Sequence, residues 1–182
     1  ATIDTSGIIN LTTTNGDMLL DAGTVTGGLT TSFLAFTTAD SLKLWNTTAS
    51  QAGVRLYVDA DGDGVGALDM TSGSLTGIAG AFAPNLSYYY NPTVFGTQDN
   101  LTASITGYNV TQWMLVNNAA NLQAVGNVAN LGGDYALGRS LDLAVDLGFT
   151  APIGSLATPF SGRFDGMGRT IGNLSLTSTA SN

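Results

Sequence analysis

The chain of 182 residues carries 13 acidic residues against five lysines and arginines, a formal net charge of −8, and it contains neither histidine nor cysteine. This length is enough for one domain with a sizeable core, and the negative charge argues against nucleic acid and anionic membranes as partners because both would be repelled. No apolar run approaches the roughly 18 residues that a membrane-spanning helix needs, so we expect no membrane insertion. Every acidic residue is aspartate and Lys43 is the single lysine, and the lack of Glu and Lys on helix surfaces argues against a helical fold.

The N-terminal part of the sequence alternates short β-prone runs with turn signals of Gly, Asn or Asp. Leu42 and Leu44 fall on one face and Lys43 and Trp45 on the other, which is the period of two expected of a half-buried strand. Residues 54–58 repeat the pattern. If such strands stack as coils, each coil takes roughly 20 to 25 residues. Turn signals spaced by about 8 to 12 residues are equally typical of a β-sandwich, so both architectures stay open here.

The run DADGDG at residues 59–64 is the sharpest chemical motif. Three carboxylates at alternate positions, with a sharp turn at Gly64, reproduce the first half of a calcium loop. The second half departs from that pattern, because position twelve is Met70 and the flanking segment is strand-like rather than helical. The alternative is a solvated polar hairpin turn. The residues that we predict as calcium ligands are Asp59, Asp61, Asp63 and Asp69.

The stretch from 79 to 99 lacks a clean period, and we expect it to leave the regular coils. It contains the run SYYYNP, and exposed aromatic side chains of this kind can stack on sugar rings. The alternative is that these aromatic side chains cover the edge of a core. The predicted ligand-binding residues are Tyr88, Tyr89 and Tyr90, with Trp45 and Trp113 as further stacking candidates.

The run NNAANLQAVGN from Asn117 predicts one short helix. It offers an Asn cap, apolar residues at helical spacing and Gly126 as a stop. Beyond it, residues 149–176 again alternate short β-prone runs with glycine-containing turns, including the turn at Asp165 and Gly166. We expect Ile171, Leu174 and Leu176 to point inward.

These C-terminal residues carry a family resemblance. Residues 113–116, 121–125, 134–143 and 149–176 resemble in order the recurring coil of large secreted bacterial adhesins of the filamentous-haemagglutinin type, and the last segment looks like their GLUG motif. The resemblance covers about a third of the chain, and residues 1–108 match only in texture. It implies a right-handed parallel β-helix that is secreted or displayed on the surface of a bacterial cell. The chain shows no NPNG-type motif, so the resemblance assigns no secretion step to it.

Six Asn-X-Ser/Thr sequons are candidate glycosylation sites, although a chain rich in Asn and Thr produces several by chance. They are Asn10, Asn46, Asn85, Asn100, Asn109 and Asn173.

Enzymatic activity is not expected. A serine nucleophile would lack its histidine base, and most aspartates sit beside Gly or Asn in turn contexts. The group of Arg163, Asp165 and Arg169 suggests a catalytic acid with cationic helpers, but the resemblance makes Asp165 a turn residue and the arginines surface partners. Polysaccharide-active solenoids keep a carbohydrate-active or carbohydrate-binding module open as the alternative.

We therefore expect an all-β chain, a right-handed parallel β-solenoid with one short helix, spanning 1–182 as a single segment. Residues 1–108 would form less regular coils and 109–182 the GLUG-like coils; the alternative is a β-sandwich-like unit followed by coils.

The expected function is that of a structural and adhesive stalk of a secreted or surface-exposed adhesin. Its partners would be a glycan or protein receptor on a host or neighbouring cell, with calcium as an expected cofactor and end-to-end self-association as a further alternative. Because the sequence starts without Met and shows no signal-peptide pattern, we expect a fragment or a mature chain.

Overall fold

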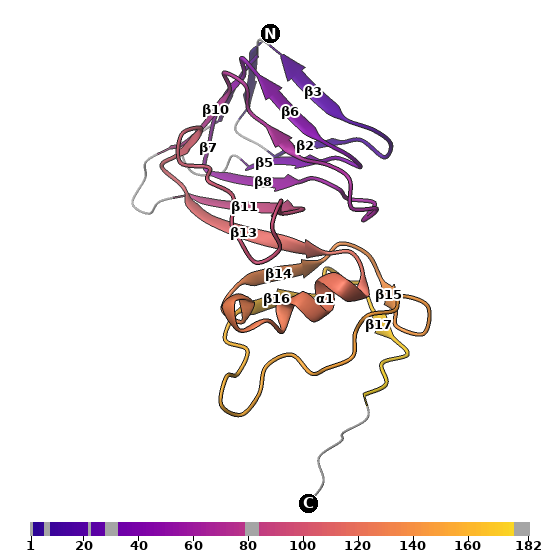
Figure 1. Ribbon diagram of the computed structural model, residues 1–182. Coiled ribbons are helices and arrows are strands. Elements are labelled where there is room, and N and C mark those ends of the chain that lie inside the picture. Colours follow the sequence, from indigo (N-terminus) through magenta and orange to yellow (C-terminus); the bar gives the residue numbers. More distant parts are fainter. Residues whose placement is uncertain (1, 6–7, 22, 28–32, 79–83, 177–182) are drawn as a thin grey trace, which may run out of the picture. The chain divides into compact units, whose positions relative to one another are not determined.

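The computed structural model describes residues 2–5, 8–21, 23–27, 33–78 and 84–176 (Figure 1). The chain divides into two compact units. The first contains residues 1–91 and 98–113, and the second contains residues 92–97 and 114–182.

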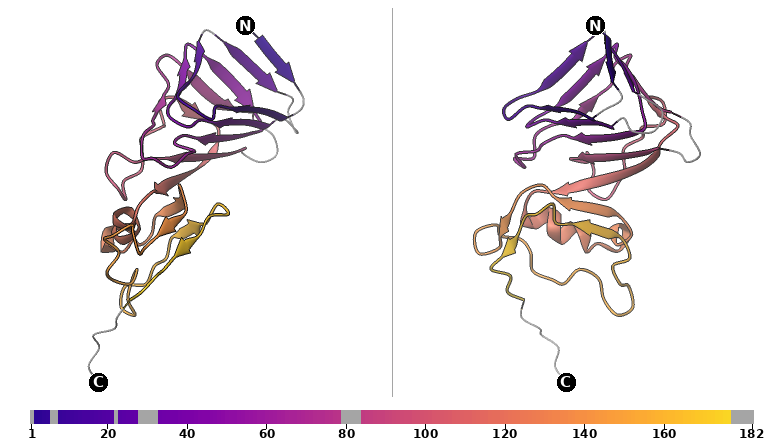
Figure 2. Two further views of the ribbon diagram at one scale, coloured as in Figure 1. Left: turned by 90° about the vertical axis from the view of Figure 1, so that its right-hand side faces the viewer. Right: turned by 180° about the vertical axis from the view of Figure 1, so that it is seen from behind.

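The first unit consists of short strands that form three sets of neighbours (Figures 1 and 2). One set has the order β1-β4-β7-β10-β12, the second β2-β5-β8-β11-β13 and the third β3-β6-β9. Their bounds are β1 (Thr2–Thr5), β2 (Ile8–Thr12), β3 (Met18–Asp21), β4 (Thr24–Gly27), β5 (Phe33–Thr37), β6 (Leu42–Trp45), β7 (Thr48–Gln51), β8 (Gly53–Tyr57), β9 (Leu68–Asp69), β10 (Ser74–Gly77), β11 (Asn85–Tyr90), β12 (Ile105–Thr106) and β13 (Asn109–Val116).

Strand pairing follows a fixed rule along most of this unit. From β1 to β8, each strand pairs in parallel with the strand three places later in the chain. The chain therefore passes through the three sets in turn, and one such passage is called a circuit below. The shortest of these register steps joins Phe33 to Gly53, and the longest joins Gly53 to Asn85. The expected step of roughly 20 to 25 residues therefore describes the pairs that end at β8 or earlier, while the steps that start at β6, β7 and β8 are longer.

The parallel pairing bears on the β-sandwich, one of the two architectures that the sequence left open. Every strand pair whose register is defined among the described residues is parallel. Because a β-sandwich is built from antiparallel strands, the sandwich alternative for residues 1–108 is wrong. Over the residues that the structure describes, the chain is mostly strands in parallel sheets with one short α-helix, as predicted at that level.

The core of the first unit consists of side chains that stack in register. Leu34, Val54 and Leu86 occupy one row across β5, β8 and β11, and each is at most 1% exposed. Parallel in-register strands place like positions about 4.8 Å apart, so the apolar side chains of one circuit cover those of the next. Phe36 and Leu56 begin a second row of the same kind.

Tight corners connect the strands of successive sets. Asn46 follows β6 with a φ of 47°, a left-handed conformation that Asn tolerates better than most residues. Its side-chain amide donates to Asp21 at 3.1 Å, and its backbone N–H donates to the carbonyl oxygen of Thr71 at 3.0 Å. The corner is thus tied to the circuits before and after it.

The second unit contains the helix and the remaining strands. Helix α1 (Ala119–Val125) lies where the sequence predicts it, with Asn118 as its cap and Ala119, Leu122 and Val125 buried. A 3₁₀ helix, η1 (Val128–Asn130), follows. The end of β13 pairs with β14 (Asp134–Leu137), β14 with β16 (Arg163–Asp165), and β15 (Leu141–Asp142) with β17 (Ile171–Gly172), all in parallel. The inward prediction for Ile171, Leu174 and Leu176 is wrong, since they are 37%, 56% and 38% exposed.

The expected excursion at 79–99 is only partly irregular. Residues 85–90 form β11, which pairs in register with β8, and the strand-free stretch runs from Asn91 to Ser104. Residues 79–83 lie outside the described residues. Leu86, Tyr88 and Tyr90 are buried at alternate positions of β11, and Tyr89 between the last two is buried as well.

Among the described residues, no helix is long and apolar enough to cross a membrane.

Candidate functional site

The DADGDG loop connects β8 to β9, and its first carboxylate is buried. Asp59 is 0% exposed and has a φ of 54°. Its carboxylate accepts from the backbone N–H of Gly64 at 3.2 and 3.3 Å and from the side-chain amide of Asn91 at 2.9 Å. Asp59 therefore holds the loop closed from within and ties it to the end of β11.

The carboxylates of the loop that face solvent meet a different aspartate. Carboxylate oxygens of Asp40, Asp61 and Asp63 lie within 4.8 Å of one another. Asp40 comes from the corner after β5, one circuit earlier, and its backbone carbonyl accepts from the N–H of Asp59 at 3.2 Å. Partial burial, and after it the negative charges of Asp61 and Asp63, raise the pKa of Asp40 above its ordinary value.

Three converging carboxylates are the type of group that binds a hard cation such as calcium. The cluster adjoins a cavity of about 260 Å³ that Asp61 lines. Its other walls are Thr12, Thr13, Thr14, Thr37, Ala39 and Ala60. The predicted ligand set is thus only partly brought together: Asp61 and Asp63 belong to the cluster and Asp59 turns inward. Calcium binding itself stays a prediction.

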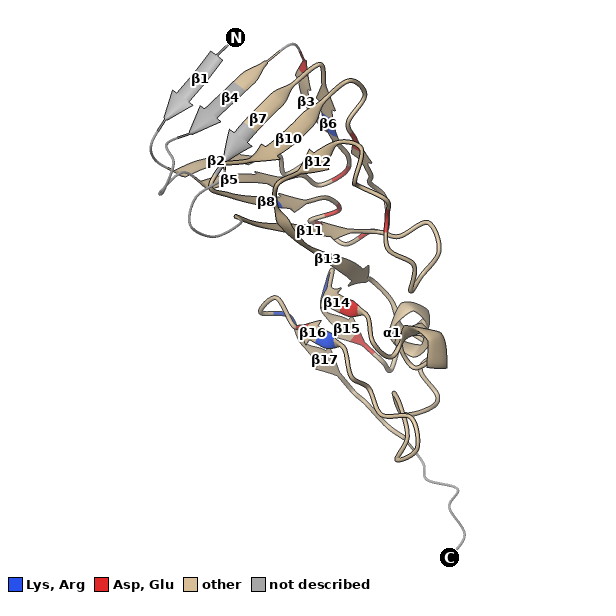
Figure 3. Cartoon of the chain, turned by 90° about the vertical axis from the view of Figure 1, so that its left-hand side faces the viewer, with Lys and Arg blue, Asp and Glu red and all other residues tan. Residues whose placement is uncertain are grey.

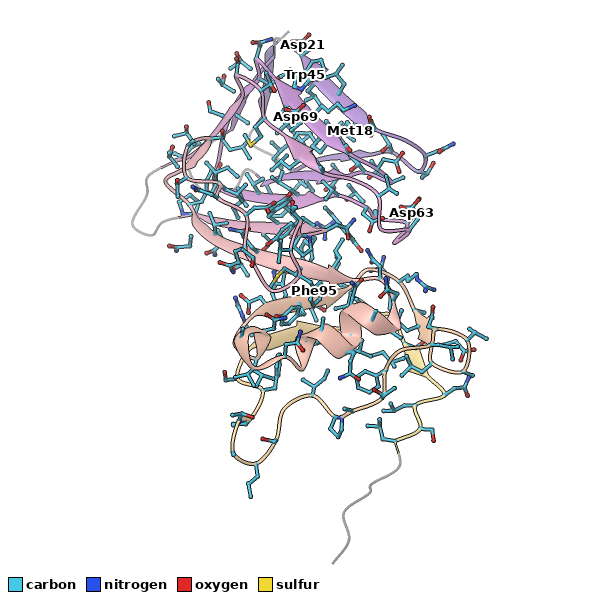
Figure 4. The ribbon with its side chains drawn as sticks, viewed as in Figure 1. Met18, Asp21, Trp45, Asp63, Asp69 and Phe95 are labelled. Carbon is cyan, nitrogen blue, oxygen red and sulfur yellow. The ribbon has the colours of Figure 1, made fainter. Side chains whose placement is uncertain are left out.

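Asp69, the fourth predicted ligand, lies on β9 outside the cluster, and its carboxylate has other hydrogen-bond partners. Its carboxylate accepts from the Trp45 indole N–H at 2.8 Å and from the hydroxyl and the backbone N–H of Thr71 at 2.7 and 3.0 Å. The Thr71 and Trp45 side-chain hydrogen bonds lower the pKa of Asp69. Figure 4 places Asp69 beside Trp45 and shows Asp63 on a separate loop.

The tyrosines predicted to stack on sugars lie inside the molecule. Tyr88, Tyr89 and Tyr90 are 1%, 8% and 0% exposed. Tyr88 stacks on Tyr90 with ring centroids 4.4 Å apart, and Tyr89 stacks on Trp113 at 5.9 Å. Burial, and after it the charge of Asp99, raises the pKa of Tyr88. These rings offer no open face to a sugar, because each is buried against its neighbours.

All six sequon asparagines are exposed. At Asn100 the side-chain oxygen accepts from the backbone N–H and the hydroxyl of Thr102 at 3.2 and 2.8 Å, which forms a local turn. The side-chain amides of Asn46 and Asn173 instead donate to Asp21 and Asp142. Glycosylation stays a prediction, and Asn100 is the sequon that lies in a strand-free segment with its amide nitrogen free of described partners.

The arginines near the C-terminus act as structural partners. Arg163 binds both carboxylate oxygens of Asp134, at 2.7 and 2.6 Å, and Arg169 donates to the carbonyl oxygen of Leu137 at 2.9 Å. Asp165 accepts from the backbone N–H of Met167 at 2.8 Å, as a turn residue does. The three side chains thus have separate partners.

Sequence reasoning missed two features. One is Asp40. It precedes the loop by about one circuit, and this spacing in the sequence could have indicated that it lies beside the loop. The other is a set of exposed threonines, Thr24, Thr48, Thr76 and Thr106, on four strands of the β1-β4-β7-β10-β12 sheet, where Thr or Ser recurs at alternate positions of the sequence. Comparison with protein-family models, with curated proteins and with solved structures gives no match for this chain.

Proposed function

We propose that the parallel sheets belong to a right-handed β-solenoid that serves as a structural and adhesive stalk segment of a large secreted or surface-exposed bacterial adhesin. The observation that carries the proposal is the regular return of the chain to each sheet, with strands paired in register three places apart. The resemblance of the C-terminal third to filamentous-haemagglutinin-type coils supports the same proposal.

The strand pairing supports the mechanical part of this proposal. Each circuit of the first unit is bound to the next by backbone hydrogen bonds in several sheets and by buried side chains such as Val54 between Leu34 and Leu86. Pulling the chain from its ends would have to break these bonds circuit by circuit, because neighbouring repeats contact mainly one another. A scaffold of this kind carries load without a large core.

The adhesive part requires a surface for a receptor. The strand-free stretch from Asn91 to Ser104 is the longest irregular segment that the structure describes in residues 33–113, and it includes the exposed sequon Asn100. Long loops on a rigid scaffold are where binding residues concentrate. We therefore propose this stretch as the part that presents side chains to a glycan or protein receptor on another cell.

The mechanical role is tested by pulling single molecules from both ends. Release of one circuit, from the shortest to the longest register step, would lengthen the chain by about 70 to 110 Å at roughly 3.3 to 3.6 Å per extended residue, and we expect force peaks at such intervals. Extension without a resolvable peak would overturn the stalk proposal. The adhesive role is tested separately: soluble chain should bind cultured cells. Replacing the exposed Thr93, Val94, Thr97 and Gln98 by Ser should abolish that binding while the force peaks persist, because Phe95, which stacks on Tyr135, is kept.

A further inference from the structure

The Asn15 turn, residues 13–17 between β2 and β3, contains the only Asn-Gly pair of the sequence. Asn15 is exposed, and Gly16 has a φ of 75°. A Cβ atom added to Gly16 would meet no other atom within 4 Å. Among the described residues, neither the Asn15 side chain nor the Gly16 N–H forms a hydrogen bond. No described contact therefore holds the side-chain amide away from the backbone nitrogen that follows it.

An asparagine that precedes glycine is able to lose ammonia in an intramolecular reaction. Hydroxide or water takes the proton of the Gly16 backbone nitrogen, which then attacks Cγ of the Asn15 side chain. A new C–N bond forms, the bond from Cγ to the side-chain nitrogen breaks, and ammonia leaves a cyclic imide behind. Water opens the imide at either carbonyl. Cleavage at Cγ gives aspartate, and cleavage at the main-chain carbonyl gives isoaspartate, whose main chain runs through Cγ.

The following residue decides how readily the ring closes. A side chain on that residue crowds the attacking nitrogen, and glycine has none. Every other asparagine that has a following residue precedes a residue with a side chain. Asn100, for example, is exposed in a strand-free segment, but it precedes Leu101 and its side-chain oxygen accepts from Thr102. Exposure, a side chain without described bonds and a following glycine thus coincide at Asn15.

The carbonyl oxygen of Gly16 ties the Asn15 turn to the next circuit. It accepts from the Thr13 hydroxyl at 3.2 Å and from the backbone N–H of Asp40 at 3.3 Å. Isoaspartate at position 15 would insert a methylene group into the main chain directly before Gly16. Because hydrogen bonds weaken steeply when their geometry changes, the displaced carbonyl would lose its bond to Asp40.

Deamidation would also add a negative charge to turns that are already acidic. The turns between the second and third sets of strands carry Asp17, Asp40, Asp61 and Asp63. Figure 3 shows acidic segments, in red, on turns that connect strands of this unit. Desolvation, and after it the charges of these neighbouring aspartates, raise the pKa of Asp40. A further carboxylate at position 15 would therefore be repelled by its surroundings in the folded chain.

We propose that Asn15 in the folded chain deamidates spontaneously, through attack by the Gly16 nitrogen, and that the isoaspartate product detaches the Asn15 turn from Asp40. This inference concerns the first unit alone and is independent of the adhesive proposal. The modification needs only water, so it would accumulate with the age of the chain.

The test is to incubate the folded full chain in mildly alkaline buffer and to map its peptides by mass spectrometry. We expect the peptide with Asn15 to gain the mass that replaces an amide by an acid, and the peptide with Asn100 to keep its mass. Electron-transfer fragmentation should find both aspartate and isoaspartate at position 15. Asn15→Gln is the matched control, because it keeps an exposed amide whose longer side chain must close a larger ring, and it should show no gain. Circular dichroism establishes that each chain is folded.

An unchanged mass at Asn15 in the folded chain would overturn the proposal. A gain that occurs only in urea would also overturn it, because the folded turn would then keep the reacting groups apart. Equal gains at Asn15 and Asn100 would refute the role of glycine. The structural consequence is measured by hydrogen exchange of the Asp40 amide, which should be faster in aged wild-type chain and unchanged in aged Asn15→Gln. Unchanged exchange in chain that carries isoaspartate would refute the detachment.

Discussion

At the scale of single residues, the aspartates of one loop have different tasks. Asp59 is buried and accepts hydrogen bonds from Gly64 and Asn91, whereas Asp63 is exposed and accepts only from the N–H of Val65, at 2.7 Å, among the bonds described. Aspartates at alternate positions of the same loop therefore differ in role: the carboxylate of Asp59 is structural, and that of Asp63 faces solvent.

We predict that Asp59→Ala lowers the free energy of unfolding by about 2 to 3 kcal/mol, because two donors lose their charged acceptor inside the loop. Asp63→Ala is the matched control, and its effect should stay within about 0.5 kcal/mol, as at other exposed sites. Urea unfolding of both variants measures the difference. Equal effects would contradict the inward position of Asp59.

The pKa of Asp40 gives a pH prediction. Because this pKa is raised, the folded chain holds the proton more tightly than the unfolded chain, whose value is near 3.8. Stability contributed by protonated Asp40 is thus full below pH 3.8 and is lost as pH rises through the raised pKa. We expect Asp40→Asn to be more stable than wild type at pH 7 and to lose this advantage at pH 3. Thermal unfolding at both pH values checks this, and a constant difference would contradict it.

The cluster of Asp40, Asp61 and Asp63 allows a direct test of calcium. If a cation binds there, millimolar calcium should raise the unfolding temperature of the wild-type chain, because a ligand that binds only the folded state stabilises it. Asp61→Asn should remove most of this increase, and Asp69→Asn, outside the cluster, should leave it intact. Calorimetric titration that gives neither heat nor thermal shift would dismiss the calcium prediction.

At the scale of elements, helix α1 depends on its cap. The side-chain oxygen of Asn118 accepts from the backbone N–H of Asn121 at 2.8 Å, which satisfies one of the donors that the first turn leaves open. Asn118→Ala should therefore cost about 1 kcal/mol of stability in the second unit. Asn127, at the start of η1, makes no side-chain cap bond, so Asn127→Ala is expected to be neutral. Hydrogen exchange of the α1 amides compares the two variants, and equal protection would refute the capping role.

At the scale of the whole molecule, stability comes from the stacking of circuits. Leu56 lies in register between Phe36 and Tyr88 and is 0% exposed, whereas Leu156 is fully exposed. We expect Leu56→Ala to cost about 2 to 5 kcal/mol and Leu156→Ala less than about 0.5 kcal/mol. Urea unfolding checks both values. A loss below about 1 kcal/mol for Leu56→Ala would mean that the rows of core side chains are not continuous.

The sequence by itself determined the local elements. Period-two runs such as 42–45 and 54–58 became strands, and the run from Asn117 to Gly126 became the short helix, because propensity, capping and alternation are encoded by residues close in the chain. The low content of helix-forming surface residues likewise fixed the all-β class.

Only the tertiary structure decided which residues meet. Asp40 joins Asp61 and Asp63, Asp59 turns inward, and Tyr88 to Tyr90 are buried, because the register is set by backbone pairing between strands that lie a whole circuit apart in the chain. The same register aligns Thr24 with Thr48, and Thr76 with Thr106, across separate strands. A single sequence does not contain that distance information: a shift of one residue in the register would reverse which side chains face the core and which face water.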